Sequence, residues 1–310
     1  MISYFSYLFL ILCVLVSVAF FTLLERKILG YVHIRKGPNK VGLIGIFQPF
    51  SDAIKLFSKE MNVMFYINMI FYVFSCLVSM ILMMILWFLF KWNYNQILIE
   101  HGMVFLLCVS SLSVYVILFG GWSSNSKYTL LGAYRAVAQV ISYEVSLSLL
   151  MISLVFFCGS FNIQKIEFFQ EHWIMFLGLF SMFIVWLVSC FAETNRSPFD
   201  LSEGESELVS GFNIEYGSWN FAILFISEYG NIILISLITS NLFFGSVGFL
   251  SMNVIMVMIL FILIRGTLVR YRYDKLMMLA WKVILPYSIV MIFIVVFLKV
   301  IMISSMFCIL

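Results

Sequence analysis

The chain has 310 residues, of which 64% are hydrophobic and only 11% are charged, and its mean hydropathy is +1.10. Soluble domains carry about a quarter charged residues, so this composition excludes an ordinary soluble protein. The formal net charge of +3 is too small, and the basic residues are too dispersed, for a protein that binds nucleic acid. We expect a single all-α integral membrane domain that covers residues 1–310.

Eight apolar runs are each long enough to cross a bilayer. A crossing needs about 20 apolar residues, and lipid forces the backbone to pair its polar groups within the segment, so the runs predict helices. The first run follows Met1 with no basic n-region and no small-residue cleavage site, and we expect a retained helix, not a signal peptide. The predicted spans are residues 2–24, 63–90, 103–121, 136–158, 172–192, 219–243, 251–269 and 283–307.

The basic residues predict which side of the membrane the loops face. Of the 18 Lys and Arg residues, all but Lys91, Lys165 and Lys299 lie in or beside the connections that follow the first, third, fifth and seventh spans. Basic loops stay on the inner side, so we expect both termini on the outer side. The expected inner loops are residues 25–62, 122–135, 193–218 and 270–282.

The first inner loop contains the amphipathic sequence FQPFSDAIKLFSKE over residues 47–60. Its apolar residues recur every three or four positions, while Asp52, Lys55 and Lys59 gather on the opposite face. We expect a helix that lies in the membrane interface. It is either a plain membrane anchor or the wall of an opening for a lipid-like ligand. The apolar positions are Phe47, Phe50, Ile54, Phe57 and Met61.

The residue types that hold redox groups are scattered. The six cysteines show no Cys-x-x-Cys or iron–sulfur spacing, and the three histidines form no pair at helical spacing within a span. The glycines after the first span match neither a Walker A motif nor a dinucleotide-binding fingerprint. We therefore expect no haem, flavin, iron–sulfur cluster, metal or nucleotide site in this chain. In the same region, Glu25 is harder to explain as a topology signal than the basic residues around it.

Glu144 and Glu228 interrupt two of the predicted spans. At 1.5 Å per residue, each lies about 12–14 Å from the inner end of its helix, close to the bilayer midplane. An ionised carboxylate there costs roughly 3 kcal/mol or more, so we expect both to face a polar interior. They are either structural, hydrogen-bonded to a Tyr or Arg, or part of a proton path. Arg135, at the inner end of the fourth predicted helix, is placed to act as a charge partner for the acids of the inner loop 193–218.

The sequence ETNRSPFDLSEGESELVSGFNIEYG, residues 193–217, concentrates acids in an otherwise apolar chain. It is either a solvated acidic loop or a segment folded inward against the helices. Apolar residues such as Phe199, Leu201 and Phe212 are interspersed with the acids and favour the second interpretation. Like charges this close repel, so we expect at least one acid to hold its proton at neutral pH. The acids are Glu193, Asp200, Glu203, Glu205, Glu207 and Glu215.

Three segments together resemble a known family. ETNRSPFDLSEGESELVSGFNIEY, ERKILGYVHIRKGPNKVG and RYRYDKLMMLAWK (270–282) are similar to the subunit 1 family of respiratory NADH:ubiquinone oxidoreductase, complex I. The resemblance covers essentially the whole chain, with matching spacing between the three segments. The Phe- and Met-rich composition also looks like that of a mitochondrially encoded protein.

The resemblance implies a core subunit of the mitochondrial inner membrane that forms much of the ubiquinone chamber and couples quinone reduction to proton translocation. Ubiquinone would be its substrate, with electrons delivered by an iron–sulfur cluster of a partner subunit. The implied partners are peripheral-arm subunits at the quinone site, neighbouring small membrane subunits and membrane lipids. The inner loops would face the matrix, and both termini would face the intermembrane space.

The resemblance also assigns two sets of functional positions in this sequence. A quinone-channel role is implied for Arg26, Arg35, Asp52 and Phe225. A role in the proton path and its coupling is implied for Glu144, Glu193, Asp200, Glu203, Glu205, Glu207, Glu215, Glu228, Arg135 and Arg196.

Two other functions fit parts of the pattern. A secondary cation or proton transporter would use the same buried acids, but it predicts inverted repeats and broken helices, which the sequence does not indicate. A related subunit of a membrane-bound hydrogenase would share the three segments without needing a quinone tunnel, and the mitochondrial composition argues against it. Activity within a large NADH:quinone-reducing assembly would separate the three.

Overall fold

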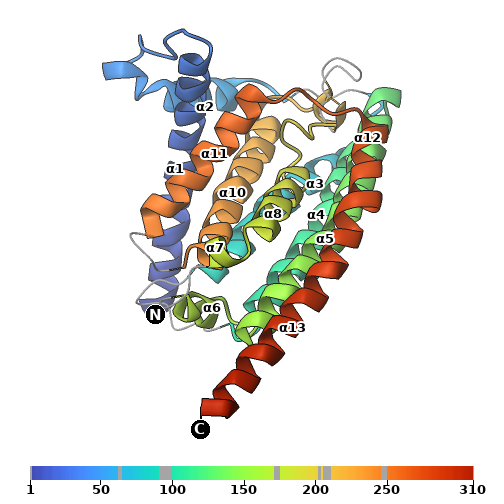
Figure 1. The fold of residues 1–310 in the computed structure, drawn as a ribbon. Helices are drawn as coiled ribbons and strands as arrows, with labels where there is room; N and C mark the ends of the chain where they lie inside the picture. The colour runs from blue at the N-terminus through green and yellow to red at the C-terminus, as the bar shows by residue number, and fades with distance from the viewer. Residues whose placement is uncertain are drawn as a thin grey trace.

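The computed structural model of the chain describes residues 2–61, 65–90, 99–170, 175–201, 204, 211–245 and 250–309. Within these ranges the regular structure is entirely helical, which confirms the predicted all-helical membrane protein (Figure 1). The long helices are α1 (Ile2–Val32), α3 (Met69–Leu86), α4 (Gly102–Ser123), α5 (Lys127–Cys158), α10 (Ser218–Phe243), α11 (Leu250–Thr267) and α13 (Leu285–Ile309). The shorter helices are α2 (Gln48–Ser58), α6 (Ile163–Phe169), α7 (Met175–Gly178), α8 (Phe180–Glu193) and α12 (Tyr273–Met278).

Seven helices in the described ranges are long and apolar enough to cross a membrane, and they correspond to seven of the eight predicted spans. The remaining span, 172–192, coincides with α7 and α8, and α8 has 14 residues. At 1.5 Å per residue α8 extends about 21 Å, which is less than the ~30 Å hydrocarbon core. The helix breaks at Leu179, directly after Gly178, and glycine has a low helix propensity. An uninterrupted eighth span is therefore not present in the described part of this run.

Several helices extend beyond the apolar runs that predicted them. α1 continues past residue 24 to Val32, through a charged stretch, because hydrophobicity marks the limit of lipid and not the end of a helix. α5 begins at Lys127 instead of residue 136, and the Ser126 hydroxyl caps it by accepting a hydrogen bond from the N–H of Thr129. Arg135 consequently lies within α5 and not in a loop.

The last helix also begins earlier than its apolar run. The chain is helical from Tyr273 onward, and a π-helix over Leu279–Ile284 joins α12 to α13. Pro286 follows this wider turn directly, in the first turn of α13. Proline has no N–H, and the carbonyl that an ordinary residue at 286 would engage, that of Lys282, lies within the π-helix. The wider turn lets the helix continue through the proline.

The ends of the long helices gather in two groups. The N–H of Asn68, just before α3, donates to the carbonyl of Ser123 at the end of α4, at 3.0 Å. We call this end of the bundle, where α1 finishes and α5 begins, the charged end. At the opposite end, called the far end, the N–H of Met103 in α4 donates to the carbonyl of Phe161 just after α5. Both termini lie at the far end, and α2 lies at the charged end (Figure 1).

The centre of the bundle is built around two helices. α10 packs against α1, α3 and α11, and α5 packs against α4, α8 and α13. Most of the largest fully buried side chains are apolar or aromatic, and they come from these two helices and their neighbours, with Tyr143, Leu147, Trp186 and Phe243 among them. The two helices that carry the predicted midplane acids are therefore the most central ones.

The crossing of α4 and α5 depends on a glycine. A Cβ atom on Gly121 would overlap the Cβ atom of Ala133, whereas a Cβ atom on Gly178 would meet no described atom within 4 Å. We expect Gly121→Ala to lower the free energy of unfolding by about 1–3 kcal/mol through overpacking. The thermal denaturation midpoint of the assembled complex measures this effect, with Gly178→Ala as the control that does not lower the midpoint. Equal midpoints for the two variants would contradict this account of the crossing.

Candidate functional site

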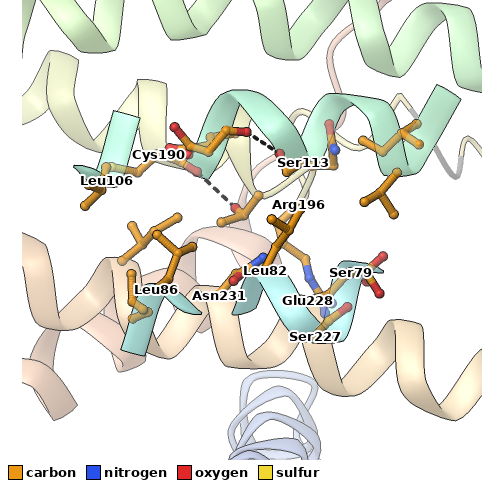
Figure 2. A pocket seen from close by; sticks show the side chains of 18 of the residues that line it. Ser79, Leu82, Leu86, Leu106, Ser113, Cys190, Arg196, Ser227, Glu228 and Asn231 are labelled. Carbon is orange, nitrogen blue, oxygen red and sulfur yellow. Dashed lines mark hydrogen bonds between the residues drawn. The ribbon is translucent and has the colours of Figure 1, made fainter. Parts of the chain in front are cut away.

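A cavity of about 130 Å³ lies inside the bundle between α3, α4, α5, α8 and α10 (Figure 2). Leucine side chains such as Leu82, Leu86 and Leu106 cover part of its wall. The remainder is polar, because the end of α8 and the middle of α10 direct carboxyl, amide and guanidinium groups into it. The polar lining residues are Ser79, Ser110, Ser113, Glu193, Thr194, Asn195, Arg196, Ser227, Glu228 and Asn231.

Three of the predicted acids lie in or beside this cavity. Glu193, the last residue of α8, and Glu228 on α10 line it from different elements. Glu144 on α5 does not belong to the lining, but it contributes, after burial, to the electrostatic environment of Glu193. A proton gained by one of these groups therefore alters the proton affinity of the other. The structure thus brings together acids that are far apart in the sequence.

Arg196 connects the cavity to a second group of charges. Its guanidinium carbon lies 4.4 Å from the centre of the Tyr229 ring, and its Nη1 atom is 3.8 Å from the Glu25 carboxylate. The Tyr229 hydroxyl donates a hydrogen bond of 2.6 Å to Glu25, and Arg265 forms an ion pair with the same carboxylate. Glu25 is only 5% exposed. We call these four residues the Glu25 cluster.

The Glu25 cluster joins four separate elements. Its members come from α1, the turn after α8, α10 and α11. Glu25 was noticed in the sequence because an acid has little use as a topology signal, but its role was not assigned. Tyr229 and Arg265 were missed as functional candidates. The only local signal was an acid beside basic residues at the end of a span.

The start of the acidic segment folds inward, as expected. Phe199 and Leu201 are buried, and so is Phe212 further along. The Phe199 ring stacks on Tyr271 with centroids 5.5 Å apart, and the Tyr271 N–H donates to the carbonyl of Pro198. Asp200 lies half-buried between these apolar neighbours. Glu203, Glu205 and Glu207 lie outside the described residues.

The side chain of Gln139 holds the same turn from α5. It is fully buried, and its Nε2 atom donates to the carbonyl of Ala192 at 2.9 Å and to that of Phe199 at 2.8 Å. One turn earlier on α5, the Arg135 guanidinium lies 6.0 Å from the centre of the Tyr273 ring on α12. The part of α5 that carries Arg135 and Gln139 therefore contacts both the acidic segment and α12.

The other end of the acidic segment is fixed by a tyrosine pair. The Tyr72 and Tyr216 rings stack 4.3 Å apart, and the Tyr72 hydroxyl donates to the backbone carbonyl of Glu215 at 2.8 Å. The Tyr216 and Ser75 hydroxyls are 3.0 Å apart. Burial raises the pKa of the Tyr216 phenol well above its ordinary value, so this hydroxyl stays protonated and available for hydrogen bonding. Glu215 is thereby held at a defined place beside α3.

Of the predicted quinone-channel residues, Arg26 and Asp52 are in direct contact. The Arg26 Nη1 atom is 2.6 Å from the Asp52 carboxylate, which also accepts a hydrogen bond from Gln48. This partly exposed ion pair links α2 to α1, and α2 also packs against α10. Arg35 is exposed in the loop after α1. Phe225 belongs to α10, and its ring centroid lies 6.3 Å from that of Tyr229. The four residues therefore lie in three separate parts of the structure: the contact between α1 and α2, the loop after α1, and α10.

The apolar stripe of α2 is uncovered in the isolated chain. Of the predicted helix over residues 47–60, Gln48–Ser58 form α2, and Met61, the last predicted stripe position, lies beyond its end. Ile54 on the stripe is 69% exposed. Phe47, Phe50 and Phe57 are also exposed, and the Phe50 ring lies edge-to-face against Phe20 of α1 with centroids 6.1 Å apart.

The fold and the cavity define a polytopic helical membrane protein that encloses carboxylates between its helices. A family model described as NADH dehydrogenase matches residues 5–296. The chain is 53% identical to NADH-ubiquinone oxidoreductase chain 1 of Rhipicephalus sanguineus, over 94% of this chain and 93% of the relative. It is 50% identical to the same protein of Anopheles gambiae, over 97% and 96%, and 46% identical to that of Metridium senile, over 91% and 88%. The chain belongs to the NADH dehydrogenase family, with the chain 1 proteins as its relatives, which confirms the resemblance of the three segments.

The Glu25 cluster predicts a large difference between a buried and an exposed acid. Glu25→Ala leaves two arginines without their buried counter-charge, and we expect it to lower the free energy of unfolding by about 3–5 kcal/mol. Asp274 forms an ion pair with Arg272 on the surface, and we expect Asp274→Ala to change stability by less than about 1 kcal/mol. The amount and the denaturation midpoint of the assembled complex measure both. Similar losses in the two variants would contradict the importance of the Glu25 cluster.

Proposed function

We propose that this chain is the membrane subunit of NADH:ubiquinone oxidoreductase that encloses ubiquinone and transmits its reduction to proton translocation. Family membership supports the assignment to this enzyme: the relatives are named as its chains, so this chain is one subunit of it, with the other subunits as partners. We place it in the mitochondrial inner membrane. The observation that carries the second part is the central cavity, where Glu193, Glu228 and Arg196 meet. Electrons reach ubiquinone from an iron–sulfur cluster of a partner subunit.

The transmembrane topology that we propose has eight crossings. α5 ends at the far end and α10 starts at the charged end, so the chain between them must return across the bundle. We assign this return to α7 and α8, which together form a shorter and broken crossing. The concentration of basic residues at the charged end directs it toward the matrix, and both termini then lie toward the intermembrane space.

Ubiquinone enters beside α2 in this proposal. The exposed stripe of α2 suits the acyl chains at the membrane interface, and the ion pair between Arg26 and Asp52 keeps the helix beside α1. The apolar tail of ubiquinone passes along this wall, with Arg26, Arg35, Asp52 and Phe225 along the channel. The polar head moves further in, toward the acidic segment.

Quinone reduction takes up protons and changes the charge near the acidic segment. Asp200, Glu203, Glu205, Glu207 and Glu215 respond to this change first. The change then reaches Glu193 and Glu228 at the cavity, and Glu193 acts on Glu144 through the repulsion between their charges. Arg196 stabilises the ionised carboxylates near it, and Arg135 does the same from its position on α5. The path thus runs from the chamber to the interior of the membrane.

The acid path predicts uncoupling when a midplane acid is removed. We expect Glu144→Gln and Glu228→Gln to reduce proton translocation or quinone turnover at least tenfold, roughly the effect of losing a required proton carrier. Proton uptake per electron in vesicles containing the assembled complex measures coupling, and NADH oxidation by an artificial acceptor confirms that the peripheral arm still works. Glu100→Gln, at the far end, is the control. A normal proton-to-electron ratio in both variants would refute the path.

The entry beside α2 predicts an effect that depends on the length of the quinone tail. Asp52→Asn removes the ion pair that holds α2 against α1, so we expect the KM for long-tailed ubiquinone to rise about tenfold while kcat changes less. Lys55→Gln, on the polar face of the same helix, serves as the control. Steady-state kinetics with long- and short-tailed quinones make the comparison, and equal effects on both substrates would count against entry beside α2.

A further inference from the structure

We propose that Gln139 is a positioning residue that holds the turn after α8 in the arrangement required for coupling. This inference rests on the proposed function, because it concerns the same cavity and the same acids. Gln139 is 0% exposed, and it lies on α5, far from the turn in sequence. Its hydrogen bonds to Ala192 and Phe199 span 53 and 60 positions of the chain.

The two hydrogen bonds are made on either side of the residues of the turn that line the cavity. Ala192 and Phe199 lie on either side of residues 193–198, and this stretch carries both Glu193 and Arg196, which line the cavity. A single side chain on α5 therefore pins both ends of the stretch. Glu144 belongs to the same helix, so the bridge also fixes the position of Glu193 relative to the acid with which it interacts.

The bridge requires a side chain with two hydrogen-bond donors. Both partners are backbone carbonyls, which only accept hydrogen bonds, so the side chain must supply two donors. The amide nitrogen of glutamine has two, and this requirement also settles which end of the amide faces the carbonyls. Its Oε1 atom is buried and accepts no hydrogen bond from the described residues. A carboxyl group of the same shape donates once when protonated and not at all when ionised.

The far end of the bundle offers a matched control. Gln170 is also 0% exposed, and its Nε2 atom donates to the carbonyls of Asn241 and Leu242, both at 2.9 Å. The chemistry of this bridge is the same, but it joins α10 to the residue after α6, away from the acids of the proposed path. Changes at Gln170 therefore report on the loss of a buried bridge in general, and changes at Gln139 report on that loss at the turn.

The test compares Gln139→Glu and Gln139→Met with Gln170→Glu and Gln170→Met in the assembled complex in vesicles. The readouts are protons translocated per electron and the pH profile of NADH:ubiquinone activity, each normalised to NADH oxidation by an artificial acceptor. We expect Gln139→Glu to keep coupled activity in mildly acidic buffer and to lose it roughly tenfold as the pH rises, since ionisation removes its last donor. Gln139→Met loses coupling at every pH. Both Gln170 variants keep the profile of the unmodified complex.

Three outcomes would overturn the inference. The first is an unchanged pH profile and proton ratio in both Gln139 variants. The second is an equal shift in the Gln170 variants. The third is failure of both Gln139 variants to assemble while both Gln170 variants assemble, because that result assigns Gln139 a purely structural role. None of these outcomes touches the proposed function, which stands or falls with Glu144→Gln and Glu228→Gln measured beside them.

Discussion

A carboxylate remains inside an apolar helix bundle only where other elements bring it positive charge and hydrogen-bond donors. Glu25 meets this condition through Tyr229, Arg265 and, at longer range, Arg196. Because its partners come from three other elements, the requirement fixes the position of α1 relative to α10, α11 and the turn after α8. Arg196 also lines the central cavity, so the packing of the periphery and the geometry of the cavity depend on the same carboxylate.

The acidic segment combines fixed ends with charged residues between them. Gln139 and the stacking of Phe199 on Tyr271 hold its start, and the pair of Tyr72 and Tyr216 holds its end. These amides, phenols and rings are uncharged, so a change in protonation of the acids leaves their contacts intact, whereas the contact of Arg196 with Glu25 is ionic. The segment can therefore change its charge without losing its attachment to the bundle. This property suits the place that we propose for the segment, between a quinone chamber and a proton path.

The sequence predicted most helices well because lipid imposes a simple rule on it. A crossing must be long and apolar, and this rule identifies α1, α3, α4, α5, α10, α11 and α13. The rule contains no information on where a helix ends outside lipid, so the extension of α1 to Val32 and the start of α5 at Lys127 were missed. The break at Leu179 was missed for a related reason: composition alone does not distinguish one long helix from two short ones.

The site was predictable to a smaller extent. Glu144 and Glu228 are conspicuous as acids within apolar runs, and their low frequency in lipid identifies them. Tyr229 and Arg265 are ordinary in their local context, and their importance depends on Glu25, which lies more than 200 positions away in sequence. The same is true of Gln139, whose partners are backbone carbonyls that no side-chain pattern reveals.

The separation between Glu25 and Arg265, 240 positions, also bears on how the molecule is assembled. A ribosome makes the chain from its N-terminus, so α1 meets the membrane long before Arg196 and Arg265 have been synthesised. During that interval the residues that enclose the Glu25 carboxylate in the folded protein, Tyr229 and Arg265 among them, are absent. The ion pair between Glu25 and Arg265 can therefore form only after α11 has been synthesised, and a nascent chain that stops before α11 lacks this partner of Glu25.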